Sequence, residues 1–299
     1  MEKSNSELIN RIDEHRDSFS KGQRKLAEYI EMHYDKAVFL TAAKLGKAVG
    51  VSESTVVRFA MELGYDGYPK FQTALEDYVR QKLNTIQRIE LASGIMSEAG
   101  VIDTVLQSDA EKIKVTLDMI NKNAFDEAVA TILKAKTVYI IGIRSCAPLA
   151  SFLAFYMNLV CDDVRILQTT NSSELFEQMI KISEKDVIIG ISFPRYSMRT
   201  LKALEFANNR NAKVITITDG DHSPMTLYSS CNLFAKSDMV SIVDSLVAPL
   251  SLINALIVSL CMKKKNTVMK TLEEMEQIWD EYQIYNNDEI NRISNRIDI

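Results

Sequence analysis

The sequence is poor in the residues that build metal centres and disulfide frameworks. Its 299 residues include four cysteines and three histidines, and no two cysteines form a CxxC pair. Scattered cysteines are typical of chains that fold in a reducing compartment, so this pattern argues against a zinc cluster and a disulfide framework. So few histidines also argue against a histidine-rich metal site. We therefore expect neither a resident metal nor a cofactor.

The start of the sequence lacks an apolar core. The opening segment, MEKSNSELINRIDEHR, is charged, which argues against a secretory signal or a membrane anchor there. One stretch, residues 239–262, is long and apolar enough for a membrane span and is followed by three lysines. Asp244, Pro249 and Asn254 interrupt it, and polar groups are costly in lipid. We interpret it as a buried or subunit-interface helix and expect a cytoplasmic protein.

An excess of basic charge is also missing. The sequence has 35 lysines and arginines against 40 aspartates and glutamates, which gives a net charge of −5 and an isoelectric point near 5.4. This balance argues against a general coat of nucleic acid or anionic lipid, but it allows a local DNA-reading face. The hydrophobic content of 46% excludes a largely disordered chain, and the length suggests two domains, or one large α/β domain with an appendage.

Two regions of the chain differ in the period of their apolar residues. Residues 18–83 repeat them at helical spacing without a strand-like run, which predicts an all-α domain. After residue 138, short β-branched runs alternate with helical segments. This alternation predicts parallel strands joined by crossovers, and hence a doubly wound, three-layer α/β fold. The predicted strands cover residues 138–143, 164–167, 187–193, 213–218 and 232–236, and residues 85–135 are predicted to be helical.

The segment 41–65, TAAKLGKAVGVSESTVVRFAMELGY, has the spacing of a helix-turn-helix. A helix from about Ala42 to Val49 ends at Gly50, which can adopt the left-handed conformation that a tight corner needs. Ser52 then caps a second helix, which is the helix that enters the DNA major groove in this motif. The pattern therefore predicts a recognition helix that starts just after Ser52.

Polar side chains at the start of this second helix suit the reading of base edges, and nearby lysines suit phosphate contacts. Upstream, Ser20 and Gln23 form the S-x-x-Q pattern that opens a supporting first helix. Residues 1–84 hold 13 basic and 13 acidic side chains, so a positive face requires an uneven distribution. Many helical hairpins share this pattern, and a helical interaction module is the alternative. The candidate DNA-binding residues are Ser52, Glu53, Ser54, Thr55 and Arg58, with Lys44, Lys47 and Lys70 as phosphate contacts.

Two predicted strand–helix junctions combine hydroxyl groups with the start of a helix. The first strand runs into Gly142 and Ser145, where free N–H groups and the positive end of a helix make an anion site. The third strand runs into Ser192, Arg195 and Ser197, and a guanidinium with two hydroxyls suits a phosphate. Plain strand-to-helix turns with solvated side chains are the alternative. Ligands bind open α/β sheets at the carboxyl ends of the strands, where both loops are expected to meet.

These motifs together resemble the RpiR/MurR family of bacterial transcriptional regulators, in which a helix-turn-helix precedes a sugar isomerase (SIS) domain. The resemblance covers nearly the whole chain in order, apart from the far tail. The matching residues are Thr41 to Gly50, Val51-Ser52-x-Ser54-Thr55-Val56-Val57-Arg58-Phe59, Leu63-Gly64-Tyr65 followed by Gly67-Tyr68, Gly142-x-x-Ser145, residues 191–197 (ISFPRYS), and Thr218-Asp219 with Ser223-Pro224.

The resemblance implies a dimer or tetramer that binds a palindromic operator and senses a phosphorylated sugar in the SIS pocket. Carried over by position, Ser145, Ser192 and Ser197 would hold the phosphate. Phosphate loops of SIS domains often read Gly-x-Gly-x-Ser, and here Arg144 occupies the second glycine position. Arg144 either adds charge to the phosphate or narrows the pocket. The candidate ligand-binding residues are Gly142, Arg144, Ser145, Ser192, Arg195, Ser197 and, after the fourth strand, Thr218.

The expected organisation follows from the resemblance together with the change of period. We predict a helix-turn-helix DNA-binding domain over residues 1–84 and a helical linker over residues 85–110. The SIS domain is predicted over residues 111–265, and a C-terminal helical tail over residues 266–299.

An enzyme, a sugar-phosphate isomerase or lyase with an accessory helical domain, is the rival interpretation. Isomerisation needs a base beside the carbon that loses its proton, and His222 and Glu174 are the candidates. Neither has a convincingly spaced partner, and an isomerase has no need of the helix from Ser52 to Arg58. A helical protein–protein adaptor is a third interpretation, and it predicts no salt-dependent DNA binding. We favour a DNA-binding transcriptional regulator, not an enzyme, that a phosphorylated sugar controls.

Overall fold

A computed structural model describes residues 7–38, 40–82, 100–168, 171–237, 244–282 and 284 of the chain. Two compact units are present, and the break between them falls between Leu106 and Gln107. Part of the predicted linker, residues 85–99, lies outside the described residues, as do residues 239–243 and the end of the predicted tail, 285–299. The predicted domain boundaries stay predictions.

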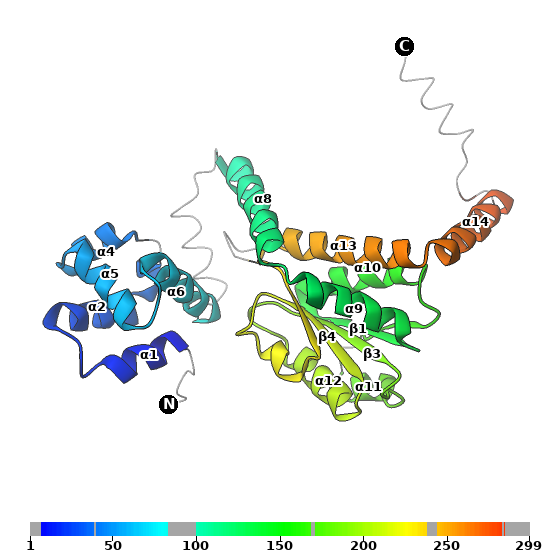
Figure 1. Ribbon diagram of the computed structural model, residues 1–299, viewed down its shortest axis with the longest axis horizontal. Coiled ribbons are helices and arrows are strands. Elements are labelled where there is room, and N and C mark those ends of the chain that lie inside the picture. The colour runs from blue at the N-terminus through cyan, green and yellow to red at the C-terminus, as the bar shows by residue number, and fades with distance from the viewer. Residues whose placement is uncertain are drawn as a thin grey trace, which may run out of the picture. The chain divides into compact units, whose positions relative to one another are not determined.

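The first unit is all helical, as its apolar period predicts (Figure 1). Its core gathers around Phe59, which is fully buried and whose ring centroid lies 5.2 Å from that of Phe19 and 5.8 Å from that of Phe71. Leu26 and Leu45 complete this core without exposed surface. The helices are α1 (Glu7–His15), α2 (Lys21–Met32), α3 (Tyr34–Ala37), α4 (Ala42–Val49), α5 (Glu53–Glu62) and α6 (Tyr68–Lys82).

The start of α2 has the predicted cap. The Ser20 hydroxyl accepts a hydrogen bond from the Gln23 N–H at 3.4 Å, and the Gln23 side chain accepts one from the Ser20 N–H at 2.9 Å. This reciprocal pair satisfies two N–H groups that a helix start leaves without partners. The prediction that this helix is the first of the domain is wrong, because α1 precedes it and buries Leu8 and Ile12.

The second unit contains a five-stranded parallel sheet in the order β2-β1-β3-β4-β5. β1 is a continuous apolar run because both of its faces are covered, as parallel strands require. Val138 and Ile140 belong to the core on one face of the sheet, and Tyr139 and Ile141 belong to the core on the other. The strands are β1 (Val138–Gly142), β2 (Val164–Ile166), β3 (Val187–Ile191), β4 (Lys213–Thr218) and β5 (Cys231–Phe234).

Helices cover both faces of this sheet, which confirms the predicted three-layer α/β fold (Figure 1). One face carries α9 (Lys122–Lys134), α10 (Ala147–Met157) and α13 (Val247–Lys263). The other carries α11 (Ser172–Gln178) and α12 (Met198–Asn209). The remaining elements are α8 (Val101–Met119), α14 (Lys265–Glu281) and two short 3-10 helices, η2 (Arg144–Cys146) and η3 (Pro224–Tyr228).

The apolar stretch at the end of the sequence forms α13, a core helix. Leu252, Ile253, Leu256 and Leu260 are buried against the sheet. Among the described residues, no single helix is both long and apolar enough to cross a membrane. α13 and α14 meet that length and composition only as a pair, and the pair is bent by 96° at its junction. The interpretation of this stretch as a buried helix is confirmed for its described part.

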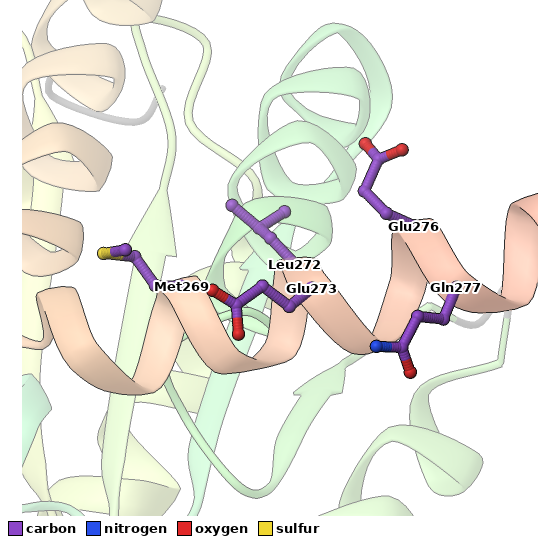
Figure 2. Close-up of a pocket in the computed structure, with 5 residues that line it drawn as sticks. All are labelled: Met269, Leu272, Glu273, Glu276 and Gln277. Atoms are coloured by element: carbon purple, nitrogen blue, oxygen red, sulfur yellow. The ribbon is translucent and has the colours of Figure 1, made fainter.

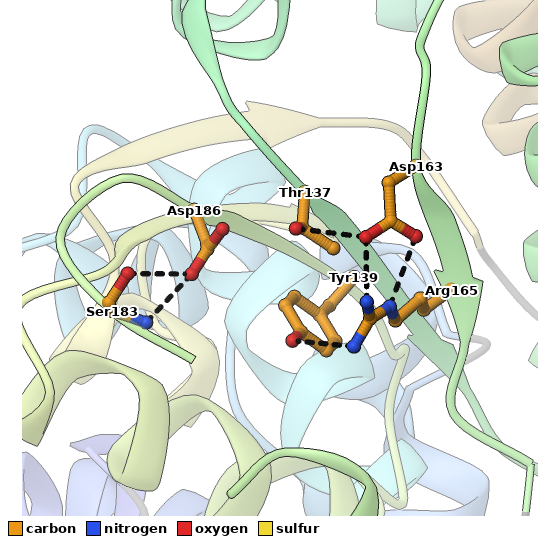
Figure 3. A network of polar contacts seen from close by, with 6 residues as sticks. All are labelled: Thr137, Tyr139, Asp163, Arg165, Ser183 and Asp186. Carbon is orange, nitrogen blue, oxygen red and sulfur yellow. Dashed lines mark hydrogen bonds and ion pairs between the residues drawn. The ribbon is translucent and has the colours of Figure 1, made fainter. Parts of the chain in front are cut away.

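A polar network joins the amino ends of β1 and β2 (Figure 3). Arg165 donates two hydrogen bonds to the Asp163 carboxylate, at 2.7 Å and 3.0 Å, and a longer one to the Tyr139 hydroxyl at 3.4 Å. Thr137 donates to the same carboxylate at 3.1 Å. The Arg165 guanidinium lowers the pKa of Asp163 below its ordinary value. These contacts hold the amino ends of β1 and β2 together.

Two of the cysteines have pKa values well above the ordinary one. Burial raises the pKa of the Cys161 thiol and that of the Cys231 thiol from 9.0 to about 11. The Cys231 thiol also donates to the backbone carbonyl of Ala124 at 3.0 Å. Both thiols therefore hold their protons in the folded chain at pH values where an unfolded chain has lost them.

We expect the stability of the protein to fall between pH 9 and pH 11 because of these thiols. Over that interval the unfolded chain binds fewer protons, so the free energy of unfolding decreases as pH rises; below pH 9 this contribution is fully present. Urea unfolding at pH 8, 9.5 and 10.5 measures the slope. The double variant Cys161→Ala, Cys231→Ala should show a shallower decline, and an equal decline would contradict the assignment.

Candidate functional site

The turn between α4 and α5 has the predicted helix-turn-helix geometry. Gly50 ends α4 with φ 77° and ψ 38°, a left-handed conformation that glycine adopts without strain. The Val51 N–H donates to the Gly46 carbonyl at 2.8 Å. Ser52 caps α5, and its hydroxyl accepts from the Thr55 N–H at 3.3 Å. The chain therefore turns within three residues, from Gly50 to Ser52.

The two faces of α5 differ in exposure. Val56, Phe59 and Ala60 point into the core, and the side chains at the start of the helix are at the surface. The Arg58 guanidinium donates to the Ser54 carbonyl at 3.3 Å and to the Ser54 hydroxyl at 3.5 Å. These hydrogen bonds hold the Arg58 side chain towards the first turn of the helix. Of the candidate DNA-binding residues, Thr55 is half-buried, and Ser52, Glu53, Ser54, Arg58, Lys44, Lys47 and Lys70 are exposed.

Sequence analysis does not predict the part that α1 plays beneath α5. The Arg11 guanidinium lies 4.7 Å from the ring centroid of Tyr65 and donates to the Leu63 carbonyl at 2.8 Å. Gly64, with φ 82°, lies between them, and an added Cβ would come within 2.9 Å of that guanidinium. The Leu-Gly-Tyr motif thus ends the recognition helix and accommodates α1. An arginine 52 residues away from Leu63 leaves no local signal of this contact.

Gly46→Ala is expected to destabilise the first unit by about 1–3 kcal/mol. A Cβ at Gly46 would lie 2.8 Å from the backbone carbonyl oxygen of Val51, so α4 and α5 would have to separate. Gly22→Ala is the matched control, because its nearest neighbours are side-chain methyl groups at 3.3 Å and 3.4 Å. Urea unfolding of the two variants measures the difference, and equal effects would contradict this account of the corner.

The carboxyl ends of β1 and β3 form the switch point of the sheet. The two strands are neighbours, with Gly142 opposite Ile191, and the chain continues from them to opposite sides, to β2 and to β4. Loops diverge at such a point and leave a crevice between them, which is where open α/β sheets bind ligands. The two predicted anion loops, residues 143–146 and 192–197, are the loops that leave it.

The first loop is compact and carries an unusual backbone conformation. A Cβ on Gly142 would lie 2.5 Å from the Cys146 carbonyl oxygen, so only glycine fits there. Arg144, at the second glycine position of the family pattern, has φ 61°, which is costly for a residue with a side chain. Arg144 and Ser145 are both exposed, and α10 follows with Pro148 in its first turn. The loop thus keeps the glycine-like backbone and adds a cation.

The second loop places its serines around the start of α12. Ser192 is buried, and its hydroxyl accepts from the Ser197 N–H at 3.2 Å. The half-buried Ser197 caps α12 and accepts from the Thr200 N–H at 3.4 Å. Arg195 is exposed, and its φ of 65° matches the left-handed conformation of Arg144. The two loops at the switch point therefore each present an exposed arginine on a left-handed backbone.

The loop after β4 is tied to the second loop. Thr218 is fully buried, and its hydroxyl contacts the Asp219 carboxylate at 3.1 Å and the Ser223 hydroxyl at 2.7 Å. The Tyr196 hydroxyl donates to the same carboxylate at 2.8 Å. These contacts engage the Thr218 hydroxyl within the protein, and its predicted contact with a ligand stays a prediction. Tyr196 lies within the segment 191–197, and nothing in its spacing indicates this partner.

Thr200 is a second residue that sequence analysis does not select. Its side chain is fully buried in the first turn of α12, and within the described residues its hydroxyl has no hydrogen-bond partner. A buried hydroxyl without a partner costs free energy unless another group supplies one. Its position three residues after Ser197 is its only signal in the sequence.

A helix-turn-helix unit joined to an α/β unit with a parallel sheet is an architecture of transcriptional regulators. Models of two families match the chain: the helix-turn-helix domain of the rpiR family over residues 6–82, and the SIS domain over residues 131–259. The chain belongs to the RpiR family of transcriptional regulators, as its motifs predict.

Known relatives agree with this assignment. The chain is 25% identical over 223 residues to the HTH-type transcriptional regulator HexR of Escherichia coli, a match that covers 71% of this chain and 72% of HexR. The sugar isomerase domain of an RpiR transcription factor from Sphaerobacter thermophilus has a TM-score of 0.57 and 25% identity, covering 60% of this chain and 99% of that one. The NanR protein of Vibrio vulnificus, solved in complex with ManNAc-6P, shares the fold, with a TM-score of 0.55, 22% identity and coverage of 91% and 98%.

Proposed function

We propose that the operator affinity of this regulator is controlled by a phosphorylated sugar bound at the carboxyl edge of its SIS sheet. The observation that carries the proposal is that one chain combines two exposed polar surfaces. The first is the start of α5, from Ser52 to Arg58, whose shape suits the major groove. The second is the pair of serine and arginine loops at the switch point, which suits a small phosphate.

The DNA contacts in this proposal divide into two kinds. The polar side chains of Ser52, Ser54 and Arg58 reach base edges, and Arg58 is suited to the O6 and N7 acceptors of guanine. Exposed lysines of α4 and α6 contact phosphates and fix the position of the helix on the duplex. A palindromic operator requires a two-fold assembly of this chain, with recognition helices about 34 Å apart or a multiple of that distance.

The phosphate contacts come from both loops. Ser145, Ser192 and Ser197 donate hydroxyl hydrogen bonds, and Arg144 and Arg195 supply positive charge, so the departure at position 144 aids binding. The Ser192 hydroxyl already accepts from a backbone N–H, which leaves its own proton free to be donated. NanR shares this fold and is solved with ManNAc-6P, which supports a phosphorylated sugar as the class of ligand.

The sugar phosphate must bind two arrangements of the protein unequally in order to change operator affinity. A ligand with equal affinity for the DNA-competent and DNA-incompetent arrangements would shift neither. By the same linkage, operator DNA must change the affinity for the sugar phosphate by the same factor. This reciprocity is a direct check on the coupling.

Isomerase activity is the competing function, and the position of its candidate bases disfavours it. Glu174 follows β2, His222 follows β4, and both are exposed. β2 and β4 are three positions apart in the sheet, which separates their ends by about 14 Å. A single proton transfer between two sugar carbons needs a base within hydrogen-bond reach. Incubation with a panel of phosphorylated sugars, followed by NMR, should therefore show no product.

A thermal-shift screen of phosphorylated sugars tests the whole proposal. A ligand that binds only the folded protein raises its melting temperature as its concentration exceeds the dissociation constant. Each hit is then added to an operator titration at fixed salt, and we expect the operator affinity to change. Hits that stabilise the protein but leave operator affinity unchanged would contradict the regulatory role. If inorganic phosphate stabilised the protein as much as the phosphorylated sugars do, the sugar part would not be recognised.

A further inference from the structure

Helix α14 carries a short apolar seam on its exposed side, with opposite charges at the two ends. Lys265, Met269, Leu272 and Glu276 follow one another at intervals of four, three and four residues, which places them on one face of the helix. All four are exposed, Met269 by 48% and Leu272 by 38%. Met269, Leu272 and Glu276 line a surface pocket together with Glu273 and Gln277 (Figure 2).

A neighbouring face of α14 contacts the rest of the second unit. Val268 is buried, and Met275 and Trp279 are partly buried. The helix is 17 residues long, and in proteins most helical stability comes from the packing of an amphipathic face. Exposed Met269 and Leu272, next to each other on the helix surface, are therefore the kind of apolar patch that another molecule covers.

The order of charges identifies the occupant. From the amino end of the seam to its carboxyl end, the side chains are positive, apolar, apolar and negative. In the opposite direction the order is negative, apolar, apolar and positive. An antiparallel pair of these helices therefore brings Lys265 opposite Glu276 twice and Met269 opposite Leu272 twice, around a two-fold axis between residues 270 and 271. A parallel pair would instead place like charges together. We propose that this seam is an antiparallel contact between the α14 helices of two copies of this chain.

Of the other charges on the helix, Glu273 flanks the seam, and one ion pair lies away from it. Lys270 pairs with Glu274 within the same helix, at 3.7 Å, and both lie on the side opposite the seam. Isologous contacts of this kind are the commonest in homo-oligomers, because one self-complementary patch serves both copies.

The size of the seam sets the strength of the association. It spans 11 residue steps, about 16 Å of helix, and offers four side chains from each copy. A stable dimer buries about 800 Å² on each partner, which is more than this contact supplies alone. We therefore expect a weak, salt-sensitive association that orients copies relative to one another. The proposed function requires that two copies associate, but not that they do so through α14, so loss of this contact alone would leave the proposed function intact.

Disulfide cross-linking of the full chain tests the geometry. In the variant Lys265→Cys, Glu276→Cys the two new cysteines lie about 16 Å apart along one helix, too far for a disulfide within a copy. In an antiparallel pair, the cysteine at position 265 of one copy lies beside the cysteine at position 276 of the other. Under mild oxidation we expect a covalent dimer on a non-reducing gel. Lys270→Cys, Glu281→Cys has the same spacing on the opposite side of the helix and is the matched control.

Three results would overturn the proposal. The first is the absence of a covalent dimer from Lys265→Cys, Glu276→Cys. The second is an equal yield from the control pair, which would place the contact on another face. The third is an equal yield from Lys265→Cys alone, which would indicate a parallel arrangement. The unaltered chain measures the background from the native cysteines.

Charge exchange tests the same contact without oxidation. Lys265→Glu sets two pairs of like charges against each other, and we expect the dissociation constant for self-association to rise about tenfold in sedimentation at low salt. Adding Glu276→Lys reverses the polarity of the seam and should restore the association. Circular dichroism confirms that the helix is intact. No self-association by the unaltered chain, or no recovery in the double variant, would refute the contact.

Discussion

Arg58→Ala is expected to lower operator affinity by about tenfold to a hundredfold, because a bidentate contact to a base contributes about 1–3 kcal/mol. Arg58 is exposed in the middle of α5, one turn after Ser54, and its guanidinium is held by the Ser54 carbonyl and hydroxyl. Its removal uncovers no core residue, so the folded state should be retained. A fluorescence-anisotropy titration with operator DNA at fixed salt measures the loss.

The same titration separates base contacts from phosphate contacts. Loss of a base contact reduces affinity for the operator more than affinity for unrelated DNA. Loss of a phosphate contact reduces both affinities equally, and the number of ions released on binding falls by about one. Met61→Ala is the matched control, since Met61 is 60% exposed in the last turn of the same helix. Equal operator affinity for Arg58→Ala and Met61→Ala would contradict the assignment of α5.

The architecture of both units follows from local patterns in the sequence. β4 spans the predicted residues 213–218, and β1 begins at the predicted Val138. The corner at Gly50 and the cap at Ser52 were predictable because each depends on neighbours within three residues. Periodicity and caps are local properties, so one sequence is enough to find them.

Other features of the site depend on contacts between distant residues or on the backbone, and could not be predicted. The hydrogen bond from Tyr196 to Asp219 joins loops 23 residues apart, and the burial of Thr218 depends on the packing of the whole sheet. The left-handed backbone at Arg144 and Arg195 is also hidden, because arginine rarely adopts it. A glycine at either position would have indicated that conformation.

At position 144, where the family pattern has glycine, Arg144 keeps the left-handed backbone conformation that glycine favours. A left-handed conformation at a non-glycine residue costs roughly 1–2 kcal/mol, and strain of this kind persists where the surroundings hold it in place. Two arginines carry it on adjacent loops of one sheet edge. Both side chains are exposed, and in the proposed function they supply positive charge to the phosphate.

Ser197→Ala is expected to abolish the response of operator binding to the sugar phosphate. Removal of a hydrogen bond to a charged group should lower the affinity for the sugar phosphate about tenfold to a hundredfold. Ser197 also caps α12, however, and loss of a cap costs about 1 kcal/mol of stability. The alanine variant alone therefore combines a ligand effect with a structural one.

Ser197→Asp separates the two effects. Aspartate caps a helix as well as serine does, so the stability of α12 is retained, but its carboxylate repels a phosphate. We expect this variant to bind operator DNA normally and to ignore the sugar phosphate. Asn121→Ala is the matched control: it removes the cap of α9, whose side chain accepts from the Ala124 N–H at 3.1 Å, and should keep the full response. Asn121→Ala controls for the loss of a cap in Ser197→Ala, whereas Ser197→Asp keeps its cap, so a full response from the aspartate variant would place the ligand elsewhere.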